Sequence, residues 1–131
     1  MSLVEAMAGA FVLSVGILGM ASLLTQSQQL TRHAEQTHVA FVAAQERLED
    51  LREYSRLNFD RVRDNFDGVG FDVMGLTAVG EDPDGLPGMI RIEPVDPNDP
   101  TSRLLDVAID VEFEGVSGAR VVTMETRLAP R

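Results

Sequence analysis

The chain has 131 residues, enough for one small domain with an extended element, and 44% of them are hydrophobic. Its formal net charge is −10. Nucleic acid and anionic lipid headgroups are therefore disfavoured as partners, because both would be repelled. The sequence contains no cysteine, which excludes a disulfide framework and thiolate chemistry.

The first element in chain order is a long apolar segment. Residues 6–24 carry no charge, and the charge-free run extends to Thr31. This length is close to the ~20 residues that span a bilayer as a helix. The run is longer than the hydrophobic part of a signal peptide, and no basic residue precedes it. We expect residues 1–24 to form a membrane-spanning helix; the alternative is a buried helix of a soluble core.

Three glycines interrupt this apolar segment, at Gly9, Gly16 and Gly19. Small residues let two helices approach closely within a membrane. Each glycine also weakens a helix by about 1 kcal/mol relative to alanine. The sequence therefore predicts a helix-packing surface, with a weak point around Gly16 and Gly19.

Glu5 is the one carboxylate at the start of the apolar run. A charge inside hydrocarbon costs about 3 kcal/mol or more, so such residues usually have a partner. One interpretation is an acid that favours the exposed N–H groups at the start of a helix. The other is an intermolecular pair, in which Glu5 neutralises the α-amine of a neighbouring chain.

The stretch MSLVE, followed by about twenty apolar residues, resembles the mature N-terminus of type IV pilins and type II secretion pseudopilins. The stretch ILGMASLL resembles their minor subunits. In that family a prepilin peptidase cuts after a leader that ends in Gly, the new first residue is N-methylated, and the fifth residue is Glu. The resemblance implies that Met1 is the processed, methylated residue and that Glu5 acts in assembly. Many major pilins have Pro near position 22, where this chain has Ser22.

Residues 25–57 continue the helical pattern as an amphipathic segment, since no Gly or Pro occurs between Gly19 and Gly68. Apolar or small residues recur at spacings of three and four, which predicts a stripe along one face. The stripe consists of Leu30, Ala34, Thr37, Phe41, Ala44, Leu48 and Leu51. We predict one helix from about residue 2 to about residue 57, whose stripe packs against the rest of the chain.

Residues 58–131 are predicted to form a loop-rich segment and a globular domain. GMIRIEPV and LLDVAIDVEFEG alternate apolar and polar residues, as strands with one wet face do. ARVVTMETRL also alternates, but either the Val122 set or the Val121 set could face the core. The predicted fold class is α+β, with a long N-terminal helix and a small antiparallel sheet on its second half. The family resemblance implies the same fold.

The candidates for metal binding are weak. His33 and His38 are five residues apart, so they do not share a helix face. RDNFDG fails the EF-hand pattern, because Arg63 occupies the first ligand position. A looser Ca²⁺ site, of the kind that some pseudopilins carry, could use four other acids. Those acids, Asp82, Asp84, Asp96 and Asp99, are equally explained by Asx turns.

Nothing in the sequence predicts an enzyme or a resident cofactor. Asp60, Asp64 and Asp67 could form a carboxylate pair, but solvated loop charges account for them. The chain has no Gly-rich phosphate loop and no serine in an elbow motif.

The expected function is therefore structural: a subunit of a type IV pilus or type II secretion pseudopilus that polymerises through its N-terminal helix. The resemblance implies other pilin subunits, a prepilin peptidase and an assembly platform with its ATPase as partners. It also implies a bacterial inner-membrane location facing the periplasm before assembly, and a filament at the cell envelope or surface afterwards. The alternative is a single-pass membrane protein that binds a partner or a cation without polymerising.

Overall fold

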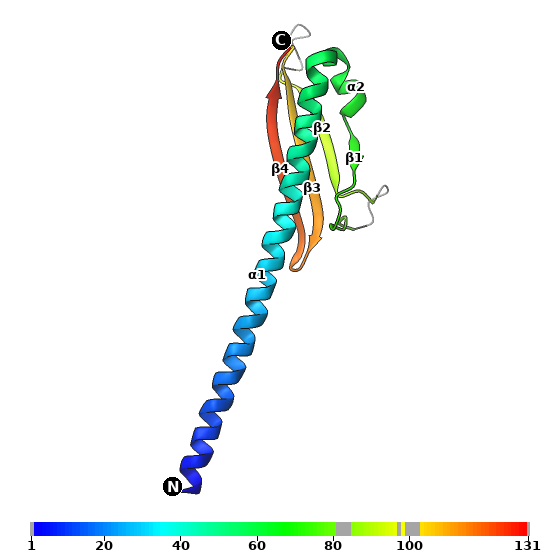
Figure 1. The fold of residues 1–131 in the computed structure, drawn as a ribbon. Helices are drawn as coiled ribbons and strands as arrows, with labels where there is room; N and C mark the ends of the chain where they lie inside the picture. The colour runs from blue at the N-terminus through cyan, green and yellow to red at the C-terminus, as the bar shows by residue number, and fades with distance from the viewer. Residues whose placement is uncertain (1, 81–84, 97, 99–102, 131) are drawn as a thin grey trace. The chain divides into compact units, whose positions relative to one another are not determined.

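A computed structural model describes residues 2–80, 85–96, 98 and 103–130. The chain divides into two units, residues 1–34 and residues 35–131. The predicted α+β fold is confirmed: one long helix is followed by a four-stranded antiparallel sheet (Figure 1).

Helix α1 runs from Leu3 to Asn58, within a residue of the predicted bounds at each end. It remains helical through Gly16 and Gly19. In residues 3–30 every large hydrophobic side chain is exposed, from 54% for Val15 to 80% for Leu3. The first unit is therefore a helix without a core of its own.

The second unit contains the rest of α1, two short helical turns and the sheet. The turns are η1 (Phe59–Arg61) and α2 (Val62–Phe66). The strands are β1 (Val69–Phe71), β2 (Gly88–Pro94), β3 (Leu105–Gly115) and β4 (Gly118–Leu128). Each strand pairs antiparallel with the next along the chain, so the sheet is a meander in the order β1-β2-β3-β4.

Two of these elements were missed by the sequence reasoning, which assigned residues 58–88 to loops. α2 has five residues and β1 has three, so neither is long enough to show a hydrophobic period. β1 is a strand because its backbone pairs with that of β2. The pairs are Val69 with Ile90, Gly70 with Met89 and Phe71 with Gly88.

The β3–β4 hairpin is long and tightly connected. Eleven residue pairs join its strands, from Leu105 with Leu128 to Gly115 with Gly118. Only Val116 and Ser117 lie between the last pair. Gly118 has φ 110°, a conformation that glycine adopts without the clash that a Cβ would cause.

The core of the second unit lies between the sheet and residues 40–51 of α1. Figure 1 shows this part of α1 running along one face of the sheet. β3 contributes alternate residues that are at most 1% exposed, namely Val107, Ile109, Val111 and Phe113. On β4 the Val122 set faces inward: Val122, Met124 and Thr126 are half-buried and Leu128 is buried.

The helix stripe in the core differs from the predicted one at its N-terminal end. Ala44, Leu48 and Leu51 are buried as expected for a packing face, but the next member is Ala40. Phe41 is 48% exposed. It follows Ala40 by one residue and therefore points about 100° away around the helix. Ala40 and Ala44 are both 0% exposed and belong to the core between helix and sheet.

The remaining members of the predicted stripe are not buried. Leu30 is 69% exposed and Ala34 is also exposed; both belong to the first unit. Thr37, in the second unit, is exposed as well. The predicted stripe therefore agrees with the buried face of α1 only from Ala44 onward, where the sheet covers the helix.

Candidate functional site

The start of α1 is capped by Ser2. Its hydroxyl oxygen accepts the backbone N–H of Glu5 at 3.3 Å, and its carbonyl oxygen accepts the N–H groups of Glu5 and Ala6 at 3.1 and 3.2 Å. Ser2 and Glu5 have the S-x-x-E spacing of a capping box, a signal that the sequence reasoning overlooked. The cap involves only the backbone N–H of Glu5, so the side-chain carboxylate takes no part in it.

The Glu5 side chain makes no ion pair or side-chain hydrogen bond with any residue that the structure describes. Met1, the predicted site of processing and methylation, lies outside the described residues. Glu5 is thus an acid at the first turn of an apolar helix, fixed in position by the cap. Its carboxylate is available to a cation from elsewhere.

The three glycines lie on the same side of α1 as Glu5. At 3.6 residues per turn, Gly9, Gly16 and Gly19 fall within roughly 40° of Glu5 around the helix axis. A Cβ built on any of them would meet nothing within 4 Å. This surface, which we call the Glu5 face, is therefore open and lacks side chains at three positions, so another helix can approach its backbone closely.

Three hydroxyl groups in the first unit are satisfied by the helix itself. Ser14, Thr25 and Thr31 each donate to the carbonyl oxygen four residues earlier, at 2.8, 3.0 and 3.0 Å. Such internal bonds are compatible with a medium that offers no water. Within the described part of the chain, α1 is the one helix that is long and apolar enough to cross a membrane.

Three of the acids considered for metal binding or catalysis have structural partners, whereas Asp64 of α2 forms no ion pair or side-chain hydrogen bond with a described residue. Asp60 pairs with Arg103 at 2.7 Å, and Asp67 accepts the backbone N–H of Ile92 at 2.8 Å. Asp96 accepts the N–H of Asn98 at 2.9 Å, which is an Asx turn. Asp82, Asp84 and Asp99 lie outside the described residues.

No cluster of three or more His, Asp or Glu residues that could hold a metal occurs among the described positions. His33 is half-buried and His38 is exposed. His38 lines an open hollow that is mostly apolar and that Glu46 and Asp72 also line.

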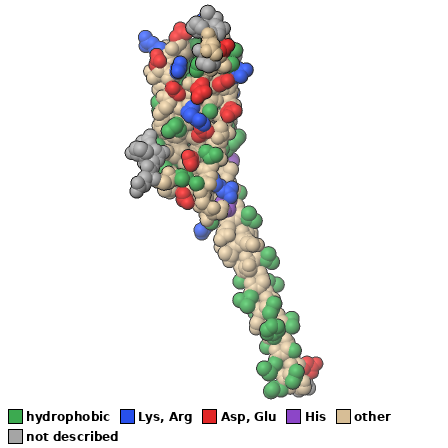
Figure 2. Space-filling view, turned by 180° about the vertical axis from the view of Figure 1, so that it is seen from behind, with side chains coloured by type: hydrophobic (Ala, Val, Ile, Leu, Met, Phe, Trp, Pro, Cys, Tyr) green, Lys and Arg blue, Asp and Glu red, His purple; other side chains and the backbone are tan. Residues whose placement is uncertain are grey.

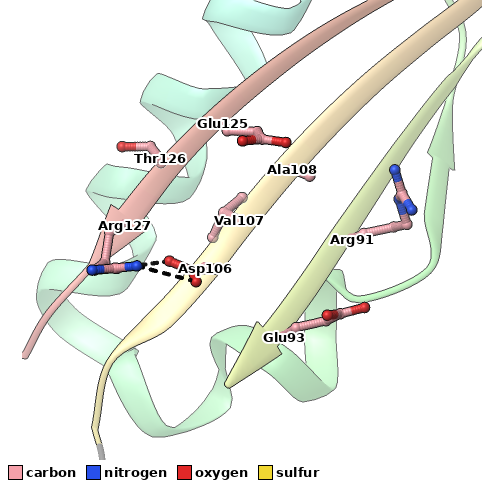
Figure 3. Close-up of a pocket in the computed structure, with 8 residues that line it drawn as sticks. All are labelled: Arg91, Glu93, Asp106, Val107, Ala108, Glu125, Thr126 and Arg127. Carbon is pink, nitrogen blue, oxygen red and sulfur yellow. Dashed lines mark hydrogen bonds and ion pairs between the residues drawn. The ribbon is translucent and has the colours of Figure 1, made fainter. Parts of the chain in front are cut away.

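The outer face of the sheet carries two paired arginines. Arg91 of β2 pairs with Asp110 of β3, which also accepts the Thr123 hydroxyl at 2.7 Å. Arg127 of β4 donates from Nε to Asp106 at 2.8 Å (Figure 3). The hydrogen bond and the charge of Asp106 raise the pKa of Arg127 above its ordinary value.

Between these pairs lies an open hollow of about 520 Å³ around the small Ala108. In Figure 3, Glu125 and Arg91 extend on either side of Ala108. Two arginines and three acids line this hollow, so its charge is negative on balance. Figure 2 likewise shows Asp, Glu and Arg side chains interspersed over this face of the second unit, and hydrophobic side chains along the first.

Comparison of the chain with models of protein families, with curated proteins and with solved structures gave no match. The functional conclusion therefore depends on the residues and geometry described above.

Proposed function

We propose that the protein is a structural subunit of a type IV pilus or type II secretion pseudopilus, held in the membrane by α1 before assembly. The observation that carries the proposal is the unpartnered carboxylate of Glu5 at the capped start of an exposed apolar helix. The sequence resemblance over residues 1–24 supports it independently.

The exposed side chains of residues 3–30 require an apolar environment. Leaving a leucine or phenylalanine in water forgoes about 1.5–3 kcal/mol per side chain relative to burial, and thirteen large hydrophobic side chains are exposed in this range. A bilayer supplies that environment to a single chain. A bundle of the same helices from many chains supplies it in a filament.

The Glu5 face is suited to the second arrangement. Three glycines let a neighbouring helix approach closely, and close packing is the main attraction between helices in lipid. When water is excluded there, an unpaired carboxylate is strongly unfavourable. Pairing with the α-amine of a neighbouring chain removes this cost and sets the axial offset between neighbouring helices.

The second unit suits the outside of such a filament. It has a buried apolar core of its own, and its outer sheet face carries paired charges. In this it differs from the first unit, whose large hydrophobic side chains are all exposed.

Glu5→Ala tests the proposal directly. In native cells we expect the variant to accumulate in the membrane at the wild-type level or above, because a charge has been removed from an apolar helix. Sheared filaments containing this protein should fall at least tenfold, measured by electron microscopy and sedimentation. The helix start is preserved, since Ser2 caps the backbone N–H of Glu5.

Ser2→Ala is the matched control, because it removes the cap and retains the carboxylate. It should weaken the helix start by about 1 kcal/mol and leave filaments in place. Filaments of Glu5→Ala that equal wild type would reject the proposal and favour a membrane-anchored protein that does not polymerise.

Mass spectrometry of the N-terminal peptide from native cells tests the processing step. We expect a peptide that begins at Met1 with a methyl group on its α-amine. A formylated initiator methionine at this position would contradict prepilin processing.

A further inference from the structure

We propose that the outer edge of β4 binds an extended segment of a partner protein, which adds to the sheet as a fifth, antiparallel strand. β4 is the last strand of the meander and forms one side of the sheet (Figure 1). It runs from Gly118 to Leu128 and pairs with β3 over all eleven residues. No other strand that the structure describes pairs with it. A free edge of this kind offers unpaired N–H and C=O groups to another chain.

The backbone groups on this free edge belong to alternate residues of β4. On β3, the N–H groups of Glu112 and Glu114 point away from β4, because they donate to the carbonyl oxygens of Pro87 and Thr77 at 2.7 and 2.8 Å. The odd-numbered residues of β3 therefore bond to β4, and the register pairs them with even-numbered residues of β4. The odd-numbered residues of β4 direct N–H and C=O outward. All five are exposed, namely Ala119, Val121, Thr123, Glu125 and Arg127.

The opposite edge of the sheet is protected in ways that β4 is not. β1 has only three residues, and beyond it the N–H of Ile92 on β2 donates to the Asp67 carboxylate at 2.8 Å. The last residue of β2 is Pro94, which has no N–H. Short edge strands, prolines and bulges all hinder the addition of a further strand. β4 contains no proline, and its eleven pairs with β3 are consecutive, so it has no bulge.

The inner side chains of β4 are incompletely covered beside this edge. On β3 the four inner residues from Val107 to Phe113 are at most 1% exposed, whereas Val122 and Met124 of β4 are only half-buried. An added strand lies about 4.8 Å from its neighbour and places its own inner side chains beside those of β4. Apolar residues at alternate positions of the partner segment would complete the cover.

The outer face favours basic residues at the other positions of the partner. Arg127 is already paired with Asp106, whereas Glu125 forms no ion pair with a described residue. Glu112 and Glu114 on the neighbouring β3 are exposed and likewise have no ion pair within the described ranges. With a formal net charge of −10, the protein attracts a basic segment and repels an acidic one. The partner segment thus alternates apolar residues facing α1 with basic residues facing solvent.

A second copy of this chain is a poorer occupant of the edge. Two identical β4 edges pair antiparallel through a half-turn about an axis perpendicular to the sheet. Residues 35–58 of the two α1 helices would then run in opposite directions. Copies held in one membrane share one direction, and this step alone rests on the proposed function. The partner is therefore a segment of a different polypeptide.

The test uses a seven-residue peptide, acetylated and amidated, in which Val and Arg alternate from a first Val to a last Val. NMR spectra of the full-length protein in maltoside detergent follow its binding. We expect saturable binding that slows amide hydrogen exchange at Val121, Thr123 and Glu125 at least about tenfold, because these N–H groups gain partners. Exchange at Val122 and Met124 should not change, since their N–H groups already face β3.

Two methylated forms of the peptide are matched controls. When the valines face α1, the arginine N–H groups face β4, so N-methylation of the arginines should abolish binding. N-methylation of the same number of valines blocks only the far edge and should leave binding in place. A peptide with Glu instead of Arg should bind at least about tenfold more weakly. Equal binding of the two methylated forms would overturn the inference, because the backbone of an added strand would not be in use.

A pair of protein variants tests the edge from the other side. Val121→Pro removes one outward N–H at a position where an edge strand tolerates proline, and it should abolish peptide binding. Val121→Thr keeps the N–H and should bind as wild type does. Wild-type binding by Val121→Pro, or no binding by the wild-type protein, contradicts the proposed site. If Val121→Pro does not fold, the methylated peptides still decide.

The same exchange measurement, made without peptide, tests for a second copy at this edge. With a different polypeptide as the partner, exchange at Val121 and Thr123 should not depend on protein concentration. Exchange that slows as the protein concentration rises would show that β4 pairs with itself, and would overturn the assignment of the partner.

Discussion

The two parts of α1 have the same secondary structure and opposite surroundings. Residues 3–34 expose every large hydrophobic side chain, whereas residues 35–58 bury Ala40, Ala44, Leu48 and Leu51 against a sheet. Helical geometry is uninterrupted across both. The comparison shows that helical geometry alone does not decide burial. Apolar residues of α1 are buried only where another part of the chain packs against them. The first part finds no such partner among the described residues.

The glycines reinforce this contrast. In the first part Gly9, Gly16 and Gly19 have open space where a Cβ would be. In the sheet, a Cβ on Gly88 would lie 2.3 Å from the ring of Phe71, the residue paired with it on β1. The space beside Gly9, Gly16 and Gly19 is open, whereas the space beside Gly88 is filled by Phe71.

The largest expected effect compares two leucines of the same helix. Leu51 is 0% exposed and Leu13 is 66% exposed. Leu51→Ala should lower the free energy of unfolding of the second unit by about 2–5 kcal/mol, because it leaves a cavity in the core. Leu13→Ala should change it by less than about 0.5 kcal/mol.

Denaturant unfolding followed by tyrosine fluorescence measures both variants. Tyr54 is the one tyrosine in the sequence, and its ring lies 5.0 Å from that of Phe66 within the second unit. Similar losses for Leu13→Ala and Leu51→Ala would break the comparison, because the exposed part of α1 would then contribute to the folded core.

A smaller effect is expected from adding one methyl group to a glycine. Gly88→Ala should cost about 1–3 kcal/mol, since the Phe71 ring must move. Combining it with Phe71→Leu should cost less than the sum of the two single changes. Gly16→Ala should leave the unfolding of the second unit unchanged. An additive double variant would show that the Phe71 ring is not the obstacle.

The smallest effect is expected from surface ion pairs of the second unit. Arg103 and Asp60 are 60% and 80% exposed, so Arg103→Gln should cost less than about 0.5 kcal/mol. Asp110 is only 16% exposed and accepts from both Arg91 and Thr123, so Asp110→Ala should cost about 1–2 kcal/mol. Chemical denaturation gives both values, and the reverse order would contradict this ranking.

Much of the fold could be predicted because its elements are long and regular. α1 lacks Gly and Pro from residue 20 to residue 58, and β3 alternates over eleven residues. The short β1 and α2 could not be predicted, because they depend on pairing and packing with distant residues. The stripe prediction included Phe41 because its spacing fits, but the residue buried at this level of the helix is Ala40.

The candidate site was predicted unevenly for similar reasons. Glu5 and the glycines stand out in an uncharged segment, so the sequence indicated them. The Ser2 cap was readable from its spacing to Glu5 and was overlooked. The contact of Arg52 with Thr126 could not be inferred, since it depends on which strand lies beside α1 and in which register.

The meander also has a consequence for the order of events during synthesis. Each strand pairs with its neighbour in the chain, so the sheet can form from local contacts, which favours fast folding. The contact of α1 with β4 is different: Thr126 follows Arg52 by 74 residues. At ribosomal elongation rates this separation corresponds to about 4–15 s. During that interval the face of α1 that later contacts β4 is not yet covered by this strand.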